Sequence, residues 1–244
     1  MASAHRPVWA VTPTYNEAEN LPELAERILA LAEPPVLLVV DDNSPDGTGR
    51  IADRLAAEHP GRFFSLHRPA KMGFASAYLL GMQYALDHGA RVVINMDADL
   101  SHDPAVIPTM LARLDEADVA LGSRYVPGGG TLNWGRERLL LSRTAGALIR
   151  LFSGLRVADP TSGFRAYSAD ILQRAKFREV RQEGYAFLSE MLFRCMRAGG
   201  RIVEVPITFE DRRAGSSKLS RRIILEAGLS LFSFGWRRLI GWRP

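Results

Sequence analysis

Two aspartates separated by one residue follow an apolar run in the segment NMDADLSHDP, residues 95–104. The run before them predicts a buried strand over 91–96. Two ionised carboxylates would repel each other and resist burial inside a strand, so we expect Asp97 and Asp99 just beyond its end. Paired carboxylates there favour a hard cation such as Mg²⁺ or Mn²⁺, which takes one or two carboxylates together with phosphate oxygens of a substrate. Chance or a helix cap, as at Asp103, is the alternative for a lone Asp-x-Asp motif.

A second acidic segment, DDNS, follows the apolar run at 36–40 in the same way. A carboxylate at the end of a second parallel strand can accept hydrogen bonds from ribose hydroxyls or from an N–H of a base, which is the role expected for Asp42. The alternative is a simple turn that ends in a Thr48 cap. The chain has neither a G-x-G-x-x-G after its first strand nor a G-x-x-x-x-G-K-[ST] motif. Phosphates must therefore be held by a metal and by cationic side chains.

Such cations are numerous, because the chain contains 28 arginines and only three lysines. The guanidinium fork matches phosphate oxygens, although any one arginine is more often a solvated surface residue. A nucleic-acid-binding surface would also be basic, but the sequence offers no aromatic stacking platform and that function leaves Asp97 and Asp99 unexplained. The candidate phosphate-binding side chains are Arg124, Arg138, Arg143, Arg212, Arg213 and Lys218.

No residue has the surroundings of a covalent nucleophile. A G-x-S-x-G motif is missing, and the only cysteine, Cys195, lies in the apolar segment EMLFRCMRAGG, where we expect a buried, inert thiol. The five histidines show no metal-binding spacing, and His102 beside the acidic pair is expected to be a supporting or surface residue.

The elements that would position these residues alternate along the chain. Apolar runs and helical periodicity predict strands at 8–12, 36–40, 63–66, 91–96 and 119–122, and helices at 21–31, 49–58, 74–87 and 105–115. This alternation predicts an α/β fold with a doubly wound, mostly parallel sheet. Since ligands bind beyond the carboxyl ends of such strands, the polar loops should share one cleft.

The remainder of the chain is less regular. The glycine-rich segment 126–135 is expected to be mobile or ordered by a ligand. A second apolar helix is predicted at 139–152, a turn-rich loop at 159–167, a strand at 202–209, a basic loop at 211–222 and a last helix at 221–240. The simplest organisation is one domain over 1–210, followed by a basic loop and an amphipathic helix over 211–244.

Composition sets limits on the function. The chain has 244 residues, 47% of them hydrophobic, which is ample for a single packed domain. Residues 201–244 hold nine Arg or Lys against four Asp or Glu, so this segment carries the basic excess. One cysteine permits no intrachain disulfide and fits a reducing compartment. The apolar run at 223–236 is shorter than the roughly 20 residues of a spanning helix. Its amphipathic period fits a helix on a membrane surface and a helix packed on the domain equally well.

Taken together and in order, the motifs resemble those of family 2 glycosyltransferases with the GT-A fold. Within that family the sequence closely resembles the group of dolichyl- and polyprenyl-phosphate mannose synthases. The segments that carry the resemblance are TPTYNEAENL, VVDDNSPDGT, KMGFASAY, MDADLSHDP, GSRYVPGG, W-x-R-x-R-x-x-x-S-R, DPTSGFRAY and EVPITFEDRRAGSSKL. The absence of a Q-x-x-R-W motif argues against a processive polysaccharide synthase.

The resemblance implies transfer of mannose from GDP-mannose to a polyprenyl or dolichyl monophosphate, with Mg²⁺ or Mn²⁺ as cofactor. The residues that would hold the guanosine are Pro13, Tyr15, Glu17, Val40 and Asp42. Asp97, Ala98 and Asp99 would bind the diphosphate, with Asp97 and Asp99 on the metal, and Ser101 stands where some relatives carry a further metal ligand. Arg124, Arg212 and Lys218 would neutralise phosphates, and with Asp99 they form the expected catalytic set. Arg124, Arg138 and Ser142 would hold the lipid phosphate, and Asp159 would organise the acceptor loop.

A lipid monophosphate is ionised near neutral pH, so it can attack the sugar without a strong general base, and one in-line displacement would give a β-linked mannosyl phosphate. The resemblance also implies peripheral attachment to the cytoplasmic face of a membrane, with a possible anchoring partner protein. Two alternatives stay open. One is a polyprenyl-phosphate glucosyltransferase that uses UDP-glucose, and the other is a non-catalytic basic module that binds membrane or nucleic acid.

Overall fold

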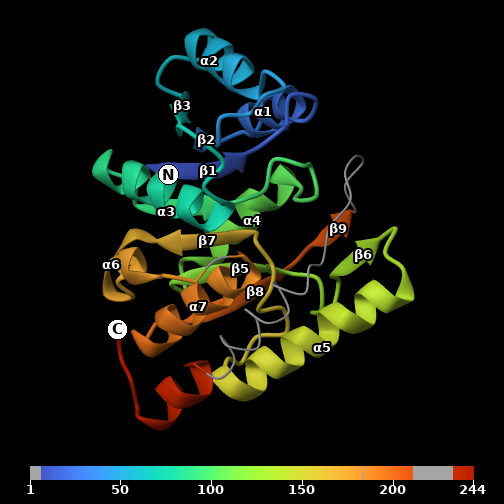
Figure 1. Ribbon diagram of the computed structural model, residues 1–244, viewed down its shortest axis with the longest axis vertical. Helices are drawn as coiled ribbons and strands as arrows, with labels where there is room; N and C mark the ends of the chain where they lie inside the picture. Colours follow the sequence, from blue (N-terminus) through green and yellow to red (C-terminus); the bar gives the residue numbers. More distant parts are fainter. Residues whose placement is uncertain (1–6, 183, 211–232) are drawn as a thin grey trace.

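The computed structural model describes residues 7–182, 184–210 and 233–244. Strands and helices alternate over most of this length, as the sequence predicts (Figure 1). The elements are β1 (Val8–Thr14), α1 (Leu21–Leu29), β2 (Val36–Asp41), α2 (Thr48–Glu58), β3 (Phe63–His67), α3 (Phe74–Asp87), β4 (Val92–Asn95), the 3₁₀ turn η1 (Pro104–Val106), α4 (Ile107–Arg113), β5 (Val119–Ser123), β6 (Gly130–Leu132), α5 (Arg136–Ser153), β7 (Arg165–Ser168), α6 (Ala169–Arg174), the 3₁₀ turn η2 (Phe177–Glu179), α7 (Gly184–Arg197), β8 (Ile202–Pro206) and β9 (Thr208–Glu210).

Seven strands form one sheet in the order β3-β2-β1-β4-β7-β5-β8. All neighbours pair in parallel except β7, which runs antiparallel to both β4 and β5. The apolar runs of β1, β2 and β4 are buried on both faces, as parallel strands between two helical layers require. The α/β fold with a mostly parallel sheet is therefore confirmed.

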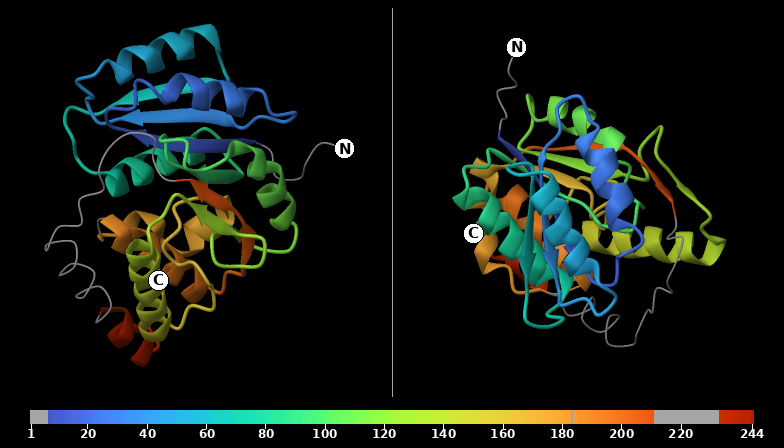
Figure 2. Two further views of the ribbon diagram at one scale, coloured as in Figure 1. Left: turned by 90° about the vertical axis from the view of Figure 1, so that its right-hand side faces the viewer. Right: turned by 90° about the horizontal axis from the view of Figure 1, so that it is seen from above.

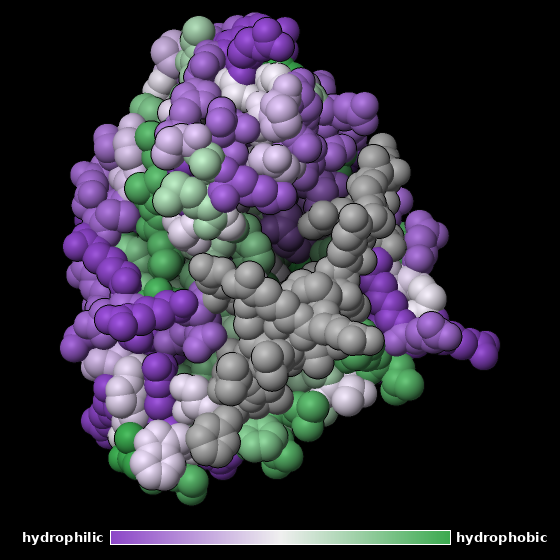
Figure 3. Space-filling model, in the orientation of Figure 1, coloured by the Kyte–Doolittle hydropathy of each residue, from purple (hydrophilic) through white to green (hydrophobic). Residues whose placement is uncertain are grey.

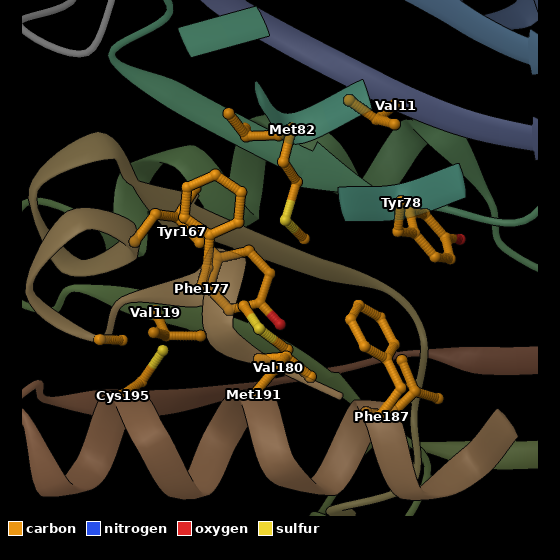
Figure 4. Packing of buried hydrophobic residues seen from close by; sticks show 14 of the residues in the cluster. Val11, Tyr78, Met82, Val119, Tyr167, Phe177, Val180, Phe187, Met191 and Cys195 are labelled. Atoms are coloured by element: carbon orange, nitrogen blue, oxygen red, sulfur yellow. The ribbon is translucent and has the colours of Figure 1, made fainter. Parts of the chain in front are cut away.

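Helices cover both faces of the sheet, with α1 and α3 on opposite sides (Figure 2). Side chains of one strand alternate between the two layers: Val11 of β1 packs in the core that contains residues of α3 and α7, and Ala10 packs in the core that contains residues of α1 and α4. Figure 4 shows the first of these cores, in which α3, α7 and the sheet meet.

Part of the loop predicted at 159–167 is instead the antiparallel strand β7. Phe164 and Ala166 face one core and Tyr167 faces the other, so the strand has the alternation of a buried strand. Arg165 occupies a core-facing position with no solvent exposure, and its charge hides that alternation in the sequence. The expectation of a loop throughout was therefore wrong.

The strand predicted at 202–209 is broken into β8 and β9. Proline has no N–H to donate, and β8 ends at Pro206. The next residue, Ile207, donates to the carbonyl of Ser123 at 3.0 Å and accepts from the Gly130 N–H at 3.0 Å, so the chain passes from one sheet to the other here. The strand β9 then pairs with β6 in a second, two-stranded sheet. Hence part of the glycine-rich segment, expected to be mobile or ordered by a ligand, is held as the strand β6.

The C-terminal tail, residues 233–244, packs against the domain. Residues 233–239 are helical, and Phe234 is buried against Phe193 of α7 with ring centroids 5.4 Å apart. Trp242 stacks on the same phenylalanine at 6.1 Å. Residues 211–232, which include all of the predicted basic loop and most of the predicted last helix, lie outside the described residues, so a boundary at 210 stays a prediction. Within the described part of the chain, no helix is long and apolar enough to cross a membrane.

Candidate active site

Loops from three neighbouring parallel strands meet at one edge of the sheet. The strands β2, β1 and β4 are adjacent and end at Asp41, Thr14 and Asn95. Backbone N–H groups of the first loop donate to side chains of the second: Asn16 to the Ser44 hydroxyl at 3.0 Å and Glu17 to the Thr48 hydroxyl at 2.9 Å. The polar loops therefore lie at one edge of the sheet, and a cleft shared by them stays a prediction.

The two neighbouring aspartates after β2 have different partners. Asp41 supports the turn, since it accepts from the Thr14 hydroxyl at 2.9 Å and from the Ser44 N–H at 3.0 Å. The Asp42 carboxylate instead forms a buried ion pair with Arg68 and accepts from the N–H groups of Met72 and Gly73 at 3.0 and 3.1 Å. Asp42 therefore holds the segment before α3, residues 68–73, at the edge of the sheet.

The other residues predicted to hold a nucleoside gather at the same edge. Pro13 and Val40 are paired in register on β1 and β2. Tyr15 follows directly after β1, and the Lys71 ammonium lies 3.8 Å from the centroid of its ring. An aromatic face next to a cation and to Asp42 suits a planar, polar heterocycle. The structure brings Pro13, Tyr15, Glu17, Val40 and Asp42 together at this edge.

The acidic pair lies just beyond β4, where the sequence places it. Asp97 is half-buried; its Oδ1 accepts from the Tyr78 hydroxyl at 2.8 Å, and its N–H donates to Nδ1 of His102 at 3.1 Å. Asp99 is buried and accepts on one oxygen from the N–H and the hydroxyl of Ser101 at 3.1 and 2.5 Å. Each carboxylate is thus held by a defined partner, Asp97 by Tyr78 and Asp99 by Ser101.

Burial determines the protonation of the groups that hold Asp97. The His102 ring stacks on Phe164 at 5.1 Å, and burial lowers the pKa of His102, against the opposing influence of Asp97 and Asp99. The ring is therefore neutral at neutral pH, as an Nδ1 that accepts a hydrogen bond requires. Burial, followed by the charge of Asp97, raises the pKa of Tyr78 well above its ordinary value, so this hydroxyl stays protonated and donates.

The donor set fits a hard cation that is shared with a substrate. Among residues 7–182, 184–210 and 233–244, no group of three or more histidine, cysteine, aspartate or glutamate side chains is placed to hold a metal. Mg²⁺ and Mn²⁺ at nucleotide sites require fewer protein ligands, because phosphate oxygens complete the coordination. Two carboxylates with Ser101 beside them meet that requirement, whereas they would not make an all-protein metal cage.

Arg124 follows β5 and forms a buried, bidentate ion pair with Asp159. Its Nε and Nη2 atoms lie 2.6 and 2.7 Å from the carboxylate oxygens, and its N–H donates to the same group at 3.1 Å. Burial alone would raise the pKa of Asp159, but the hydrogen bonds and charge of Arg124 outweigh it and hold that pKa below its ordinary value. Glu204 fixes the backbone here by accepting from the N–H groups of Ala158 and Asp159 at 2.7 and 3.0 Å.

The residues predicted to hold a second phosphate lie beside this pair. The guanidinium carbons of Arg124 and Arg138 are 5.2 and 4.1 Å from the centroid of the Trp134 ring. Ser142 accepts from the Tyr125 hydroxyl at 2.8 Å. The end of β5 and the first turns of α5 thus bring Arg124, Arg138 and Ser142 into one region. Arg143 also lies here, with its guanidinium carbon 5.5 Å from the centroid of the Tyr125 ring. Arg212, Arg213 and Lys218, three further predicted phosphate ligands, lie outside the described residues.

One segment, the 159–163 loop, lies beside both halves of the site. At one end Asp159 holds Arg124. At the other end is Gly163, where a Cβ would lie 3.6 Å from Oδ2 of Asp97 and 3.5 Å from Cε1 of His102. Beneath the loop, the buried guanidinium of Arg165 donates to the carbonyls of Pro160 and Ser162 at 2.9 and 2.7 Å.

Sequence reasoning assigned no role to Tyr78, Gly163 or Arg165, although each lies in a motif that carried the family resemblance. A tyrosine in an apolar helix has the pattern of a core residue, and the neighbouring sequence does not show which group its hydroxyl contacts. Cys195, in contrast, is buried as predicted, and burial raises its pKa to about 12, which excludes a reactive thiolate at neutral pH.

Comparison with known proteins identifies the family of the chain. Residues 9–175 match the family described as "Glycosyl transferase family 2". The chain is 43% identical over 228 residues to the polyprenol monophosphomannose synthase of Mycolicibacterium smegmatis, covering 93% of this chain and 86% of that protein. It is also 43% identical over 228 residues to the undecaprenyl-phosphate mannosyltransferase of Micrococcus luteus, with 93% of each covered.

Solved structures show the same fold. Glucosyl-3-phosphoglycerate synthase from Mycobacterium tuberculosis in complex with Mn²⁺ and uridine-diphosphate-glucose superimposes with a TM-score of 0.68 at 20% identity, covering 96% of this chain and 80% of that one. Its complex with Mg²⁺ and uridine-diphosphate also has a TM-score of 0.68, at 18% identity and the same coverage. At this identity the likeness establishes the fold.

Proposed function

The chain belongs to glycosyl transferase family 2, and from that premise we propose that it transfers mannose from GDP-mannose to a polyprenyl monophosphate. The transfer would proceed with inversion and give a polyprenyl β-mannosyl phosphate. The observation that carries the proposal is the 159–163 loop, which is paired with Arg124 at one end and lies beside Asp97 at the other. A donor held at Asp97 and Asp99 would thus lie near an acceptor phosphate held at Arg124. The names of the two bacterial relatives support mannose and a polyprenyl phosphate.

On the donor side, Pro13, Tyr15, Glu17, Val40 and Asp42 would hold the guanosine. Asp97 and Asp99, with Ala98 between them and Ser101 beside them, would hold Mg²⁺ or Mn²⁺ and the diphosphate. When bound, the cation would neutralise the negative charge that develops on the leaving diphosphate. Arg212 and Lys218 are proposed on sequence grounds to neutralise the same charge.

On the acceptor side, Arg124, Arg138 and Ser142 would bind the lipid phosphate. A phosphate monoester already carries nucleophilic oxygens near neutral pH, so catalysis requires positioning and charge stabilisation more than a general base. This agrees with the described residues, where His102 is neutral and accepts a backbone hydrogen bond, and Cys195 is an inert thiol. Asp159 forms a bidentate ion pair with Arg124, so its proposed role is to orient that guanidinium.

A lipid acceptor also requires a membrane-facing surface, and we assign it to an apolar patch on α5 and the C-terminal tail. Figure 3 shows hydrophobic surface along the α5 and tail side of the molecule. The tail lies against the end of α5, since Arg238 donates to the carbonyl of Leu151 at 2.9 Å. The exposed side chains of the apolar patch are Leu140, Leu141, Leu148, Leu151, Phe152, Trp236, Leu239 and Ile240. We propose peripheral attachment to the cytoplasmic face of a membrane through this patch, with or without an anchoring partner protein.

Product analysis tests the choice of donor and acceptor. The protein is incubated with a short polyprenyl phosphate and either radiolabelled GDP-mannose or radiolabelled UDP-glucose, and the lipid phase is extracted. We expect label in the lipid from GDP-mannose only, with a β-linked sugar in the product. Label from UDP-glucose only would keep the reaction class and overturn the donor. Label from neither would favour a non-catalytic basic module.

A further inference from the structure

Tyr78 on α3 is a buried phenol that reaches the acidic pair. It is 1% exposed, and its hydroxyl donates to Oδ1 of Asp97 at 2.8 Å. Figure 4 shows its ring above Phe187, with the hydroxyl oxygen directed away from the apolar cluster. A fully buried phenol needs a partner, and here that partner is a carboxylate of the candidate active site.

The surrounding packing fixes the position of this hydroxyl. The ring stacks on Phe187 at 6.2 Å with an interplanar angle of 8°, and Phe74 meets it edge-on at 6.2 Å. One turn further along α3, the helix approaches β1 so closely that a Cβ on Gly81 would lie 2.3 Å from Cγ1 of Val11. The helix and the ring are therefore held in place before any ligand binds.

This geometry determines how Asp97 is presented. Its backbone is held by the hydrogen bond to His102, and its Oδ1 is held by Tyr78. Beside the carboxylate, Gly163 leaves the space that a side chain would fill, with the missing Cβ 3.6 Å from Oδ2. A carboxylate held on one oxygen has its rotamer selected, and outer hydrogen bonds of this kind tune the affinity of metal sites.

We propose that Tyr78 is a positioning residue that fixes the Asp97 carboxylate for binding of the divalent cation together with the nucleoside diphosphate. This inference rests on the proposed function, because it assigns the acidic pair to a metal–nucleotide complex. Replacing Tyr78 by phenylalanine keeps the stacked ring and removes only the hydrogen bond. Without it Asp97 can rotate, so each binding event must also select the correct rotamer.

The test is calorimetric titration of the full chain with Mn²⁺ in the presence of GDP, and separately in the presence of UDP. Tyr78→Phe is compared with the wild type and with Tyr84→Phe, which removes a hydroxyl from the same helix at a ring that packs on Trp9 and His88. We expect about tenfold weaker Mn²⁺ binding for Tyr78→Phe and wild-type binding for Tyr84→Phe. In steady-state assays, the Mn²⁺ concentration for half-maximal rate should rise while kcat at saturating Mn²⁺ changes little.

The outcomes separate this inference from the choice of donor. If the wild-type protein binds Mn²⁺ in the presence of UDP but not in the presence of GDP, the proposed donor is overturned. The affinities of Tyr78→Phe and wild type for Mn²⁺ are then compared in the presence of UDP. Unchanged affinity in Tyr78→Phe, even with a lower unfolding temperature, would assign Tyr78 a purely structural role and overturn the inference. If the wild type binds Mn²⁺ with neither nucleotide, the inference fails together with the metal site.

Discussion

At the scale of single residues, the ion pair between Arg124 and Asp159 is a buried electrostatic contact of the candidate active site. Both side chains are almost fully buried and meet through two parallel hydrogen bonds. Such a pair adds little net stability compared with apolar residues, but breaking it leaves a buried charge without its partner. Its main contribution is orientation, because the guanidinium cannot turn away from Asp159 when an anion approaches.

Asp159→Asn should therefore damage both stability and transfer. We expect a loss of about 3 kcal/mol in the free energy of unfolding, measured by urea denaturation, and a lower rate even in the surviving folded protein. Asp170→Asn is the matched control, because Asp170 pairs with Arg174 at the surface, where the cost should stay below about 1 kcal/mol. A similarly small loss in the free energy of unfolding for both variants would show that Asp159 is not needed to hold Arg124.

The same pair predicts a dependence on pH with a definite sign. The pKa of Asp159 is lower in the folded protein than in the unfolded chain, so its contribution is complete above the unfolded value of about 3.9 and is lost as the pH falls through the folded value. The stability difference between wild type and Asp159→Asn should therefore be constant from neutral to mildly acidic pH and shrink in strong acid.

The residues of the site differ in how far sequence could predict them. Asp97 and Asp99 were predictable because two acids after an apolar strand have few structural explanations. Their supports were not: Tyr78 holds Asp97 but lies in an apolar helix, where its hydroxyl has no visible partner. Arg165, which holds the 159–163 loop, lies in a segment rich in turn residues. A buried hydrogen bond between distant elements leaves no local pattern.

At the scale of elements, the approach of α3 to β1 decides where the edge of the site lies. Gly81 makes that approach possible, because any side chain there would meet Val11 of the central strand. The position of α3 in turn sets the position of Tyr78 relative to Asp97. A change at Gly81 should therefore affect both packing and the site.

Gly81→Ala should destabilise the protein by about 1–3 kcal/mol, although alanine favours a helix by about 1 kcal/mol over glycine. Gly146→Ala is the control, because this glycine also lies inside a helix, yet its added Cβ would make only ordinary contacts with Pro160, at 3.6 Å. That variant should be neutral or slightly stabilising. Equal unfolding midpoints for the two variants would contradict the close packing of α3 on β1.

Sequence predicted the first half of the elements closely, including α3 with both of its ends. Those strands are continuous apolar runs and those helices have a hydrophobic period of about 3.6 residues, so each can be predicted from its own segment of sequence. It missed β7 and the division of β8 from β9. The pairing of β7 between β4 and β5 places an arginine in the core, and the separation at Ile207 follows from pairing with β6; both depend on contacts between distant segments.

At the scale of the whole molecule, the apolar patch on α5 and the tail lies on the same helix as Arg138 and Ser142. We therefore expect the phosphate of a polyprenyl acceptor to reach the site while its polyprenyl chain stays at the membrane surface. The sequence left two interpretations open for the tail. Phe234 packs on the domain, as one of them predicts, whereas Leu239 is 83% exposed, and contact with a membrane stays a prediction.

Replacing Leu140 and Leu151 together by glutamate should weaken binding to anionic lipid vesicles by about tenfold or more, because two side chains that would be buried among lipids become charged. Flotation of the protein with vesicles measures this. Leu80→Glu on α3 is the control, since Leu80 is also exposed but lies outside the patch. Equal loss in all variants would show that the patch is not the contact surface.

The most direct test of the central claim is metal-dependent transfer of radiolabelled mannose from GDP-mannose to a short polyprenyl phosphate in detergent, with Mg²⁺ or Mn²⁺ and with EDTA. Wild type is compared with Asp99→Asn and with Asp53→Asn, a surface change on α2. We predict lipid product for wild type and Asp53→Asn, and none with EDTA or in Asp99→Asn. Product that survives EDTA, or that Asp99→Asn makes at the wild-type rate, would contradict the account.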